Sequence, residues 1–80
     1  MKNFNIMITS IADVKDFVSI TSLQNFEVDL VSGRYTIDAK SIMGIFSLDL
    51  SKALNVDVHG SDEEAAKYYK LVEKYVVWEG

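Results

Sequence analysis

The chain has 80 residues, a length that suits a single domain over residues 1–80, and its 49% apolar and 25% charged residues are typical of a soluble globular protein. The net charge of −4 and the single arginine, Arg34, argue against nucleic acid and anionic membranes as partners, because both need clustered cationic side chains. Cysteine is absent, which excludes disulfides, thiolate metal ligands and a cysteine nucleophile.

No segment has the apolar length of a membrane span, and the first residues lack the apolar core of a secretory signal. The sequence therefore predicts a cytoplasmic protein, with no residue pattern that calls for a metal or a cofactor. The connections between predicted elements are short, so nothing indicates a lid over a deep pocket.

Hydrophobic periodicity predicts a first strand over residues 4–9. A helix follows, because Ser10 and Asp13 have the spacing of a capping box, in which the serine hydroxyl accepts a hydrogen bond from the third helical residue. This helix ends near residues 23–25. Its apolar face recurs at helical spacing and comprises Val14, Phe17, Val18 and Thr21.

Two strands and a short helix come next. Residues 26–30 alternate between apolar and polar, residues 31–34 suit a hairpin turn, and residues 35–39 resume the alternation. Residues 41–47 predict a short helix that starts with a serine.

The last strand is predicted over residues 55–59 and ends before Gly60. Ser61 and Glu64 form a second capping box, which opens the longest helix. One face of this helix is apolar, with Ala65, Tyr68, Tyr69, Val72 and Val76. The opposite face is charged, with Glu63, Lys67, Lys70 and Lys74.

The predicted order of elements is β-α-β-β-α-β-α. Four half-buried strands and amphipathic helices indicate one sheet with the helices stacked on a single face. We expect the core between them to be formed by Ile6, Ile8, Val18, Val28, Leu30, Ile37, Val56, Val58 and Val72.

The segment over residues 40–50 is the most informative for function. Ser41 is a candidate N-cap, and a phosphate on its hydroxyl would suit a helix start, so Ser41 is also a candidate switch. The short helix carries apolar side chains on more than one side, at Ile42, Met43, Ile45 and Phe46. We expect some of them to be exposed, and an exposed apolar patch commonly marks a contact.

Three features together resemble HPr, the small phosphocarrier of the bacterial sugar phosphotransferase system. They are the order of elements, the K-S-I-M-G motif of residues 40–44 with Ser47-Leu48 after it, and the G-S-D-E-E-A sequence of residues 60–65. The resemblance covers nearly the whole chain, and K-S-I-M-G is its most specific part. It implies an α+β open-faced sandwich, in which a four-stranded antiparallel sheet has three helices on one face.

HPr carries phosphate on a histidine at the start of its first helix, within a segment G-[LI]-H-A-R-P-A. If Ala12 matches the first alanine of that segment, Ile11 stands at the histidine position and Asp13 at the arginine position. Shifting this alignment by one residue places no histidine at the carrier position either, because His59 is the only histidine in the chain. An aspartate also repels the phosphate that an arginine would neutralise. The resemblance therefore implies a family member that is unable to relay phosphate through histidine.

In many Gram-positive bacteria a dedicated kinase phosphorylates the serine of the K-S-I-M-G motif, which is Ser41 here. The family docks sugar-system enzymes and a transcriptional regulator around this helix, at positions that match Ile42, Met43 and Phe46. The Crh-like proteins lack the carrier histidine, keep the serine and act in carbon catabolite repression. This chain is similar to them in both respects.

The main hypothesis is a bacterial regulatory module, not an enzyme, that binds a protein partner through Ile42, Met43 and Phe46, with phosphorylation of Ser41 as its control. The resemblance implies phosphotransferase enzymes, a serine kinase or a transcriptional regulator as partners. One alternative is a phosphocarrier component with a non-standard acceptor. The other is a plain HPr-fold binding module in which Ser41 is only a cap.

Other candidate residues have simpler explanations. His59 and Asp57 share a strand face, but two ligands do not make a metal site, so we expect a solvent-facing histidine at a strand end. Asp13 and Asp16 are expected to stabilise the helix start, not to accept phosphate. The spacing of four aromatic residues predicts core or rim positions, not a stacking surface, for Tyr68, Tyr69, Tyr75 and Trp78.

Overall fold

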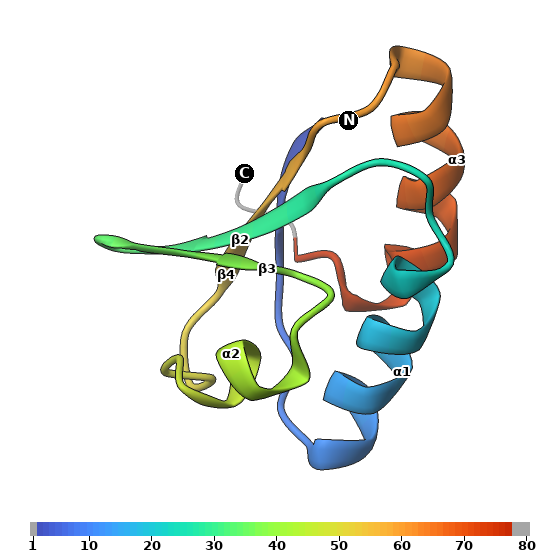
Figure 1. The fold of residues 1–80 in the computed structure, drawn as a ribbon. Coiled ribbons are helices and arrows are strands. Elements are labelled where there is room, and N and C mark those ends of the chain that lie inside the picture. Colours follow the sequence, from blue (N-terminus) through green and yellow to red (C-terminus); the bar gives the residue numbers. More distant parts are fainter. Residues whose placement is uncertain (1, 78–80) are drawn as a thin grey trace.

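The computed structural model describes residues 2–77. Four strands, three α-helices and one turn of 3₁₀-helix follow one another in the predicted order (Figure 1). Their bounds are β1 Asn3–Ile6, α1 Ile11–Ser22, β2 Val28–Ser32, β3 Tyr35–Asp38, α2 Ile42–Phe46, β4 Leu54–Val58, α3 Asp62–Val72 and η1 Glu73–Tyr75.

The strands form one antiparallel sheet in the order β1-β4-β2-β3. All three helices lie on the same face of this sheet, and the other face is open (Figure 1). The alternation within each strand explains the arrangement: in β4, Leu54, Val56 and Val58 are buried under the helices, whereas Asn55 and Asp57 lie on the open face. The predicted α+β open-faced sandwich is confirmed.

Strand β1 is shorter than predicted, because its ladder with β4 stops where Ile6 pairs with Leu54, the first residue of β4. It ends at Ile6, after which the amide of Met7 donates to the carbonyl of Tyr75 at 2.9 Å. Ile6 and Val76 form an isolated antiparallel bridge. Helix α3 accordingly ends at Val72, and Val76 belongs to this edge and not to the helix face on which it was predicted.

The hairpin between β2 and β3 is also tighter than predicted. Strand β2 extends to Ser32, which pairs with Tyr35, so only Gly33 and Arg34 form the loop. Gly33 has a φ of +59°, which glycine adopts without strain, and a two-residue loop fits the twist of the strands when its first residue is glycine in that region.

The core lies between the helices and the covered face of the sheet. Most of the predicted core side chains are buried, namely Ile6, Ile8, Val28, Leu30, Val56, Val58 and Val72. Val18 and Ile37 are only partly buried and pack against its rim. Helices α1, α2 and α3 contribute further buried side chains, including Val14, Phe17, Ile45 and Tyr68.

A buried pair of hydroxyls joins α1 to α3. The hydroxyl of Thr21 donates to the carbonyl of Phe17 at 2.8 Å and lies 2.7 Å from that of Tyr68. Because the single proton of the threonine hydroxyl is used toward Phe17, Tyr68 is the donor in the second bond. Burial raises the pKa of Tyr68 to about 12.

The remaining aromatic predictions agree with the described part of the chain. Tyr68 and Tyr75 are buried, and Tyr69 packs against the core with its ring edge-on to that of Phe4. Trp78 lies outside the described residues. Within residues 2–77, none of the helices has the length and apolar character needed to cross a membrane.

Candidate functional site

Ser41 is the N-cap of α2, as predicted. Its backbone is extended, and its hydroxyl accepts a hydrogen bond from the amide of Gly44 at 3.2 Å. Its amide donates to the carbonyl of Asp38 at 3.0 Å, which fixes the chain at the end of β3. The Ser41 side chain is exposed, so a capping serine is presented to solvent at the start of a short helix.

Gly44 has little space for a side chain. A β-carbon at this position would lie 3.2 Å from the hydroxyl oxygen of Ser41 and 3.3 Å from Cδ1 of Ile37. Both distances are tighter than most β-carbon contacts in proteins. The glycine of the K-S-I-M-G motif therefore lets α2 lie close to β3 while the serine keeps its capping bond.

Helix α2 divides its apolar side chains between the core and the surface. Ile45 is fully buried, and Ile42 is partly buried against the core. Met43 is 76% exposed and Phe46 is 40% exposed. Two of the three residues predicted to bind a partner are therefore presented to solvent, whereas Ile42 mainly anchors the helix.

The start of α1 has no histidine. Ser10 is its N-cap and accepts a hydrogen bond from the amide of Asp13 at 3.0 Å, and Ile11 is the first helical residue. Of the capping box predicted here, the structure shows this serine bond; at α3 both bonds of the box are present, between Ser61 and Glu64.

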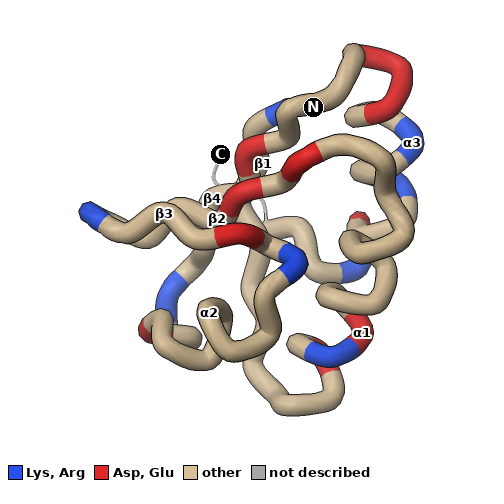
Figure 2. The backbone as a smooth tube through the Cα atoms, viewed as in Figure 1, with Lys and Arg blue, Asp and Glu red and all other residues tan. Residues whose placement is uncertain are grey.

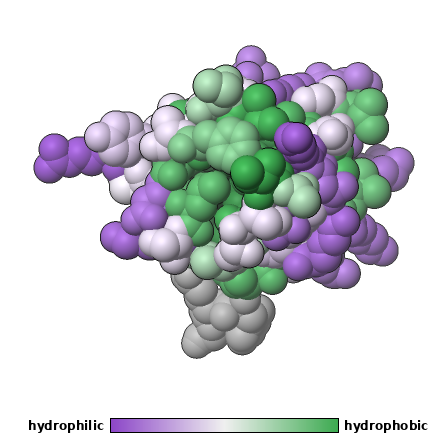
Figure 3. Space-filling view, turned by 90° about the horizontal axis from the view of Figure 1, so that it is seen from below, coloured by the Kyte–Doolittle hydropathy of each residue, from purple (hydrophilic) through white to green (hydrophobic). Residues whose placement is uncertain are grey.

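Ile11 adds to the exposed apolar surface. Its side chain is 64% exposed. Helices α1 and α2 contact each other. Apolar side chains gather on the side of the molecule where α2 and the start of α1 lie (Figure 3). The sequence predicts Ile11 at the position of the carrier histidine, and the exposure of its side chain is added by the structure.

Charged residues lie close in sequence to the exposed apolar side chains of α1 and α2. Lys40 precedes Ser41, but its ammonium donates to the carbonyl of Gln24 at 2.9 Å, so it ties α2 to the end of α1. Acidic residues lie on the sheet, at the start of α3 and on α1, where basic residues lie as well (Figure 2). Asp13 and the exposed Lys15 are within about one helical turn of Ile11, so charges of both signs border the apolar side chains of α1.

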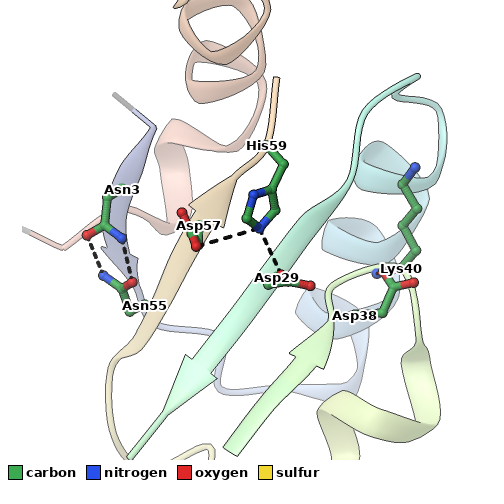
Figure 4. A network of polar contacts seen from close by, with 7 residues as sticks. All are labelled: Asn3, Asp29, Asp38, Lys40, Asn55, Asp57 and His59. Carbon is green, nitrogen blue, oxygen red and sulfur yellow. Dashed lines mark hydrogen bonds and ion pairs between the residues drawn. The ribbon is translucent and has the colours of Figure 1, made fainter. Parts of the chain in front are cut away.

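His59 lies on the open face of the sheet, away from the helices. Its Nε2 is 2.8 Å from Oδ2 of Asp29 and 3.6 Å from Oδ2 of Asp57 (Figure 4). The ring is 46% exposed, and strand register places Asp57, Asp29 and Asp38 in one row across β4, β2 and β3. Its bond to Asp29 could not be foreseen, because the two residues are distant in sequence. Among residues 2–77 no group of three His, Cys, Asp or Glu side chains has an arrangement that could hold a metal ion.

The carboxylate of Asp16 is held by two side chains from the C-terminal part of the chain. Its carboxylate lies 2.8 Å from the ammonium of Lys74 and accepts the hydrogen bond of the Tyr75 hydroxyl. The bonds from Lys74 and Tyr75 hold the pKa of Asp16 below its usual value. Burial, together with the adjacent carboxylate of Asp16, raises the pKa of Tyr75 above its ordinary value. Asp16 therefore joins α1 to the C-terminal turn.

Comparison with solved structures shows the same fold in phosphocarrier proteins. A protein described as HPr-C-His from Thermoanaerobacter tengcongensis has a TM-score of 0.73 and 30% identity, over 92% of this chain and 93% of the other. The phosphocarrier protein HPr of Bacillus anthracis has a TM-score of 0.71 and 21% identity, over 94% of this chain and 95% of the other.

The catabolite repression protein Crh of Bacillus subtilis, which forms an intertwined dimer by swapping, has a TM-score of 0.62 and 23% identity, over 92% of this chain and 88% of the other. No protein-family model matches the sequence, and no curated protein matches it. With the Thermoanaerobacter protein the similarity is one of sequence as well as of fold, over nearly the whole length of both chains. The chain therefore belongs to the HPr family of phosphocarrier proteins.

Proposed function

We propose that this protein is a cytoplasmic, single-domain regulatory member of the HPr family, which binds a protein partner and does not relay phosphate through histidine. The observation that carries the proposal is the contrast between two helix starts. The start of α1 presents Ser10, Ile11 and Ala12 and no imidazole, whereas the start of α2 presents an exposed serine.

The chemistry at the start of α1 disfavours a relay. A phosphoryl group on imidazole nitrogen keeps a high transfer potential, whereas a phosphate ester on a serine such as Ser10 is too stable to be passed on. The carboxylate of Asp13 lies in the first turn, where it opposes the approach of a phosphoryl group. His59 cannot substitute, because it lies on the opposite face of the sheet, between Asp29 and Asp57.

Ser41 is suited to accept a phosphate. It is exposed, and its hydroxyl oxygen already accepts the bond from Gly44, so it is held in one position at the surface. Phosphorylation adds about −1.5 to −2 charges at this exposed position. We infer that the phosphorylated form favours a partner with a cationic patch.

The proposed docking surface consists of the exposed side chains of Met43 and Phe46, the partly buried Ile42 of the same helix, and the exposed Ile11 at the start of α1, the helix that contacts α2. Apolar side chains held on short, well-packed elements make contacts at low entropic cost. By family resemblance, the partner is a phosphotransferase enzyme, a serine kinase or a transcriptional regulator. The chain is proposed to act through the protein that it binds and to have no enzymatic activity of its own.

The proposal is tested by incubation with ATP and the HPr serine kinase. We expect one acid-stable phosphate per chain by intact mass, which is lost in Ser41→Ala and kept in Ser47→Ala. Ser47 is a matched control, because it is the exposed serine at the other end of the same helix. If the wild-type protein takes up no phosphate, Ser41 is only a cap and the chain is a plain binding module.

A further inference from the structure

A cavity of about 370 Å³ lies between the β2–β3 hairpin and the connection from α2 to β4. Both segments lie at the same edge of the molecule (Figure 1). The principal lining residues are Ser32, Arg34, Tyr35, Leu48, Asp49 and Lys52. Its size is at the lower end of the range of about 300–1,000 Å³ that is usual for small-molecule sites.

Two cationic side chains line this cavity from different segments. Arg34, the only arginine of the chain, is at the tip of the hairpin, and Lys52 belongs to the α2–β4 connection. Figure 2 shows basic residues on both segments. Neither side chain forms an ion pair with another of the described residues, whereas Lys2, Lys67 and Lys74 each do. On a chain of net charge −4, two unpaired cations beside one cavity favour an anion.

The one acid of the lining is already engaged. Oδ1 of Asp49 accepts hydrogen bonds from the amide of Ser51 at 3.0 Å and from its hydroxyl at 2.6 Å. Its charge is therefore directed toward the loop and partly satisfied there. After the two hydrogen bonds from Ser51, the charge of Lys52 also contributes to lowering the pKa of Asp49, so this carboxylate offsets part of the positive charge of Lys52. Two cations against one carboxylate still leave the cavity with a net positive charge.

The rest of the lining is apolar or aromatic. Strand register places Tyr35 on the same face of the sheet as Ile37 and Leu30, so its ring lies on the helix side, where Leu48 is partly buried against the core. The Tyr35 side chain is nevertheless 70% exposed, because the cavity leaves it without a packing partner. An unpacked aromatic ring offers a flat surface on which a planar group can stack.

We propose that this cavity binds a small phosphate monoester, with the phosphate between Arg34 and Lys52 and the organic part against Tyr35 and Leu48. A guanidinium holds two phosphate oxygens with a fixed geometry, and an ammonium adds a point charge. A nucleoside monophosphate and a sugar phosphate share this chemistry, and only the first has a planar base to stack. The inference is independent of the function proposed for Ser41.

The test is a titration of the amide resonances of the wild-type protein with phenyl phosphate. We expect saturable shifts confined to residues 32–35 and 47–52, with inorganic phosphate binding more weakly and phenol more weakly still. AMP and ribose 5-phosphate distinguish the two sources, because the nucleotide gains the stacking contact and should bind more tightly. Shifts that do not saturate, or that sodium chloride reproduces at matched ionic strength, would overturn the proposal.

Variants separate the site from general electrostatics. Arg34→Ala should weaken phenyl phosphate binding by roughly threefold to tenfold, the loss expected for a charged hydrogen bond near the surface. Lys67→Ala removes the same charge from an exposed position on α3 and should change the affinity by less than about twofold. Tyr35→Leu should weaken phenyl phosphate more than inorganic phosphate. Equal losses in Arg34→Ala and Lys67→Ala would contradict the assignment.

Discussion

The hydroxyl of Ser41 and the backbone amide of Gly44 are joined by a 3.2 Å hydrogen bond, and a β-carbon on Gly44 would lie 3.2 Å from the same hydroxyl oxygen. A side chain at position 44 would therefore crowd the hydroxyl of Ser41. The capping bond does not by itself require a glycine, because the same bond forms between Ser10 and Asp13 and between Ser61 and Glu64. What distinguishes position 44 is the second close neighbour, Ile37, at 3.3 Å.

This relationship predicts non-additive mutations. An interior Gly→Ala substitution in a helix normally stabilises by about 0.5–1 kcal/mol. In Gly44→Ala we expect this gain to be absent, because the new methyl crowds Ser41 and Ile37. In Ser41→Ala/Gly44→Ala part of it should return, because the hydroxyl is gone. Urea unfolding of the wild-type protein, the two single variants and the double variant measures the coupling. Additive changes in the free energy of unfolding would show that the Ser41 hydroxyl and the new methyl group do not interact.

The cap itself should be measurable. Ser41→Ala removes the acceptor for the Gly44 amide, and we expect a loss of about 1 kcal/mol in the free energy of unfolding. Ser41→Asp keeps a hydrogen-bond acceptor at the same position, so its free energy of unfolding should fall much less. The comparison by urea unfolding is decisive, since equal losses in the two variants would show that the capping bond contributes nothing.

Neighbouring apolar residues of α2 should respond very differently to truncation. Ile45 is fully buried, so Ile45→Ala should cost about 2–5 kcal/mol. Met43 is 76% exposed, and Met43→Ala should change stability by less than about 0.5 kcal/mol. Thermal unfolding of the two variants checks the assignment of one side chain to the core and the other to the docking surface. A large loss of stability in Met43→Ala would show that the Met43 side chain packs in the core and is not part of the docking surface.

The contact of Asp16 with Lys74 and Tyr75 predicts acid sensitivity. The pKa of Asp16 is lowered in the folded protein, so its stabilising effect is present above the unfolded value of about 3.9 and is lost as the pH falls through the folded value. Asp16→Asn should therefore destabilise the protein at neutral pH and flatten the acid limb of its stability curve. An acid limb of unchanged slope in this variant would show that Asp16 does not stabilise the fold.

The buried hydroxyl of Tyr68 predicts sensitivity at alkaline pH. Its pKa is raised to about 12, so the neutral form is the one that the fold stabilises. This contribution is complete below the unfolded value of about 10 and is lost as the pH rises toward 12. Tyr68→Phe removes the hydrogen bond to Thr21 and should lower the free energy of unfolding by about 1 kcal/mol at neutral pH. Above pH 10 the stability of this variant should depend less on pH than that of the wild-type protein. Unfolding curves at several alkaline pH values provide the measurement; identical pH dependence in both proteins would contradict the account.

The sequence was sufficient to predict the fold because local and global signals agree. Each strand alternates, each helix starts at a serine cap, and the two patterns place the same residues in one core. The errors occurred where a distant segment decides the outcome. Strand β1 ends at Ile6 because its partner strand β4 begins opposite it at Leu54, and the local pattern near Ile6 carries no information on that register.

The candidate site was predicted in part for the same reason. The cap at Ser41 is a local property and was readable from one serine and the apolar residues after it. The division between buried Ile45 and exposed Met43 depends on how α2 packs against β3, which periodicity over a five-residue helix cannot define. The bond of His59 to Asp29 and the cavity beside Arg34 each join segments distant in sequence.

The central claim is that this HPr-family protein does not carry phosphate on histidine. The most direct measurement is the intact mass of the wild-type protein and of His59→Gln after incubation with phosphoenolpyruvate and the first enzyme of the sugar phosphotransferase system. We predict no added phosphate on either protein, because the start of α1 has no imidazole and His59 lies on the opposite face of the sheet. An acid-labile phosphate on the wild-type protein would contradict the account, and its loss in His59→Gln would identify the acceptor.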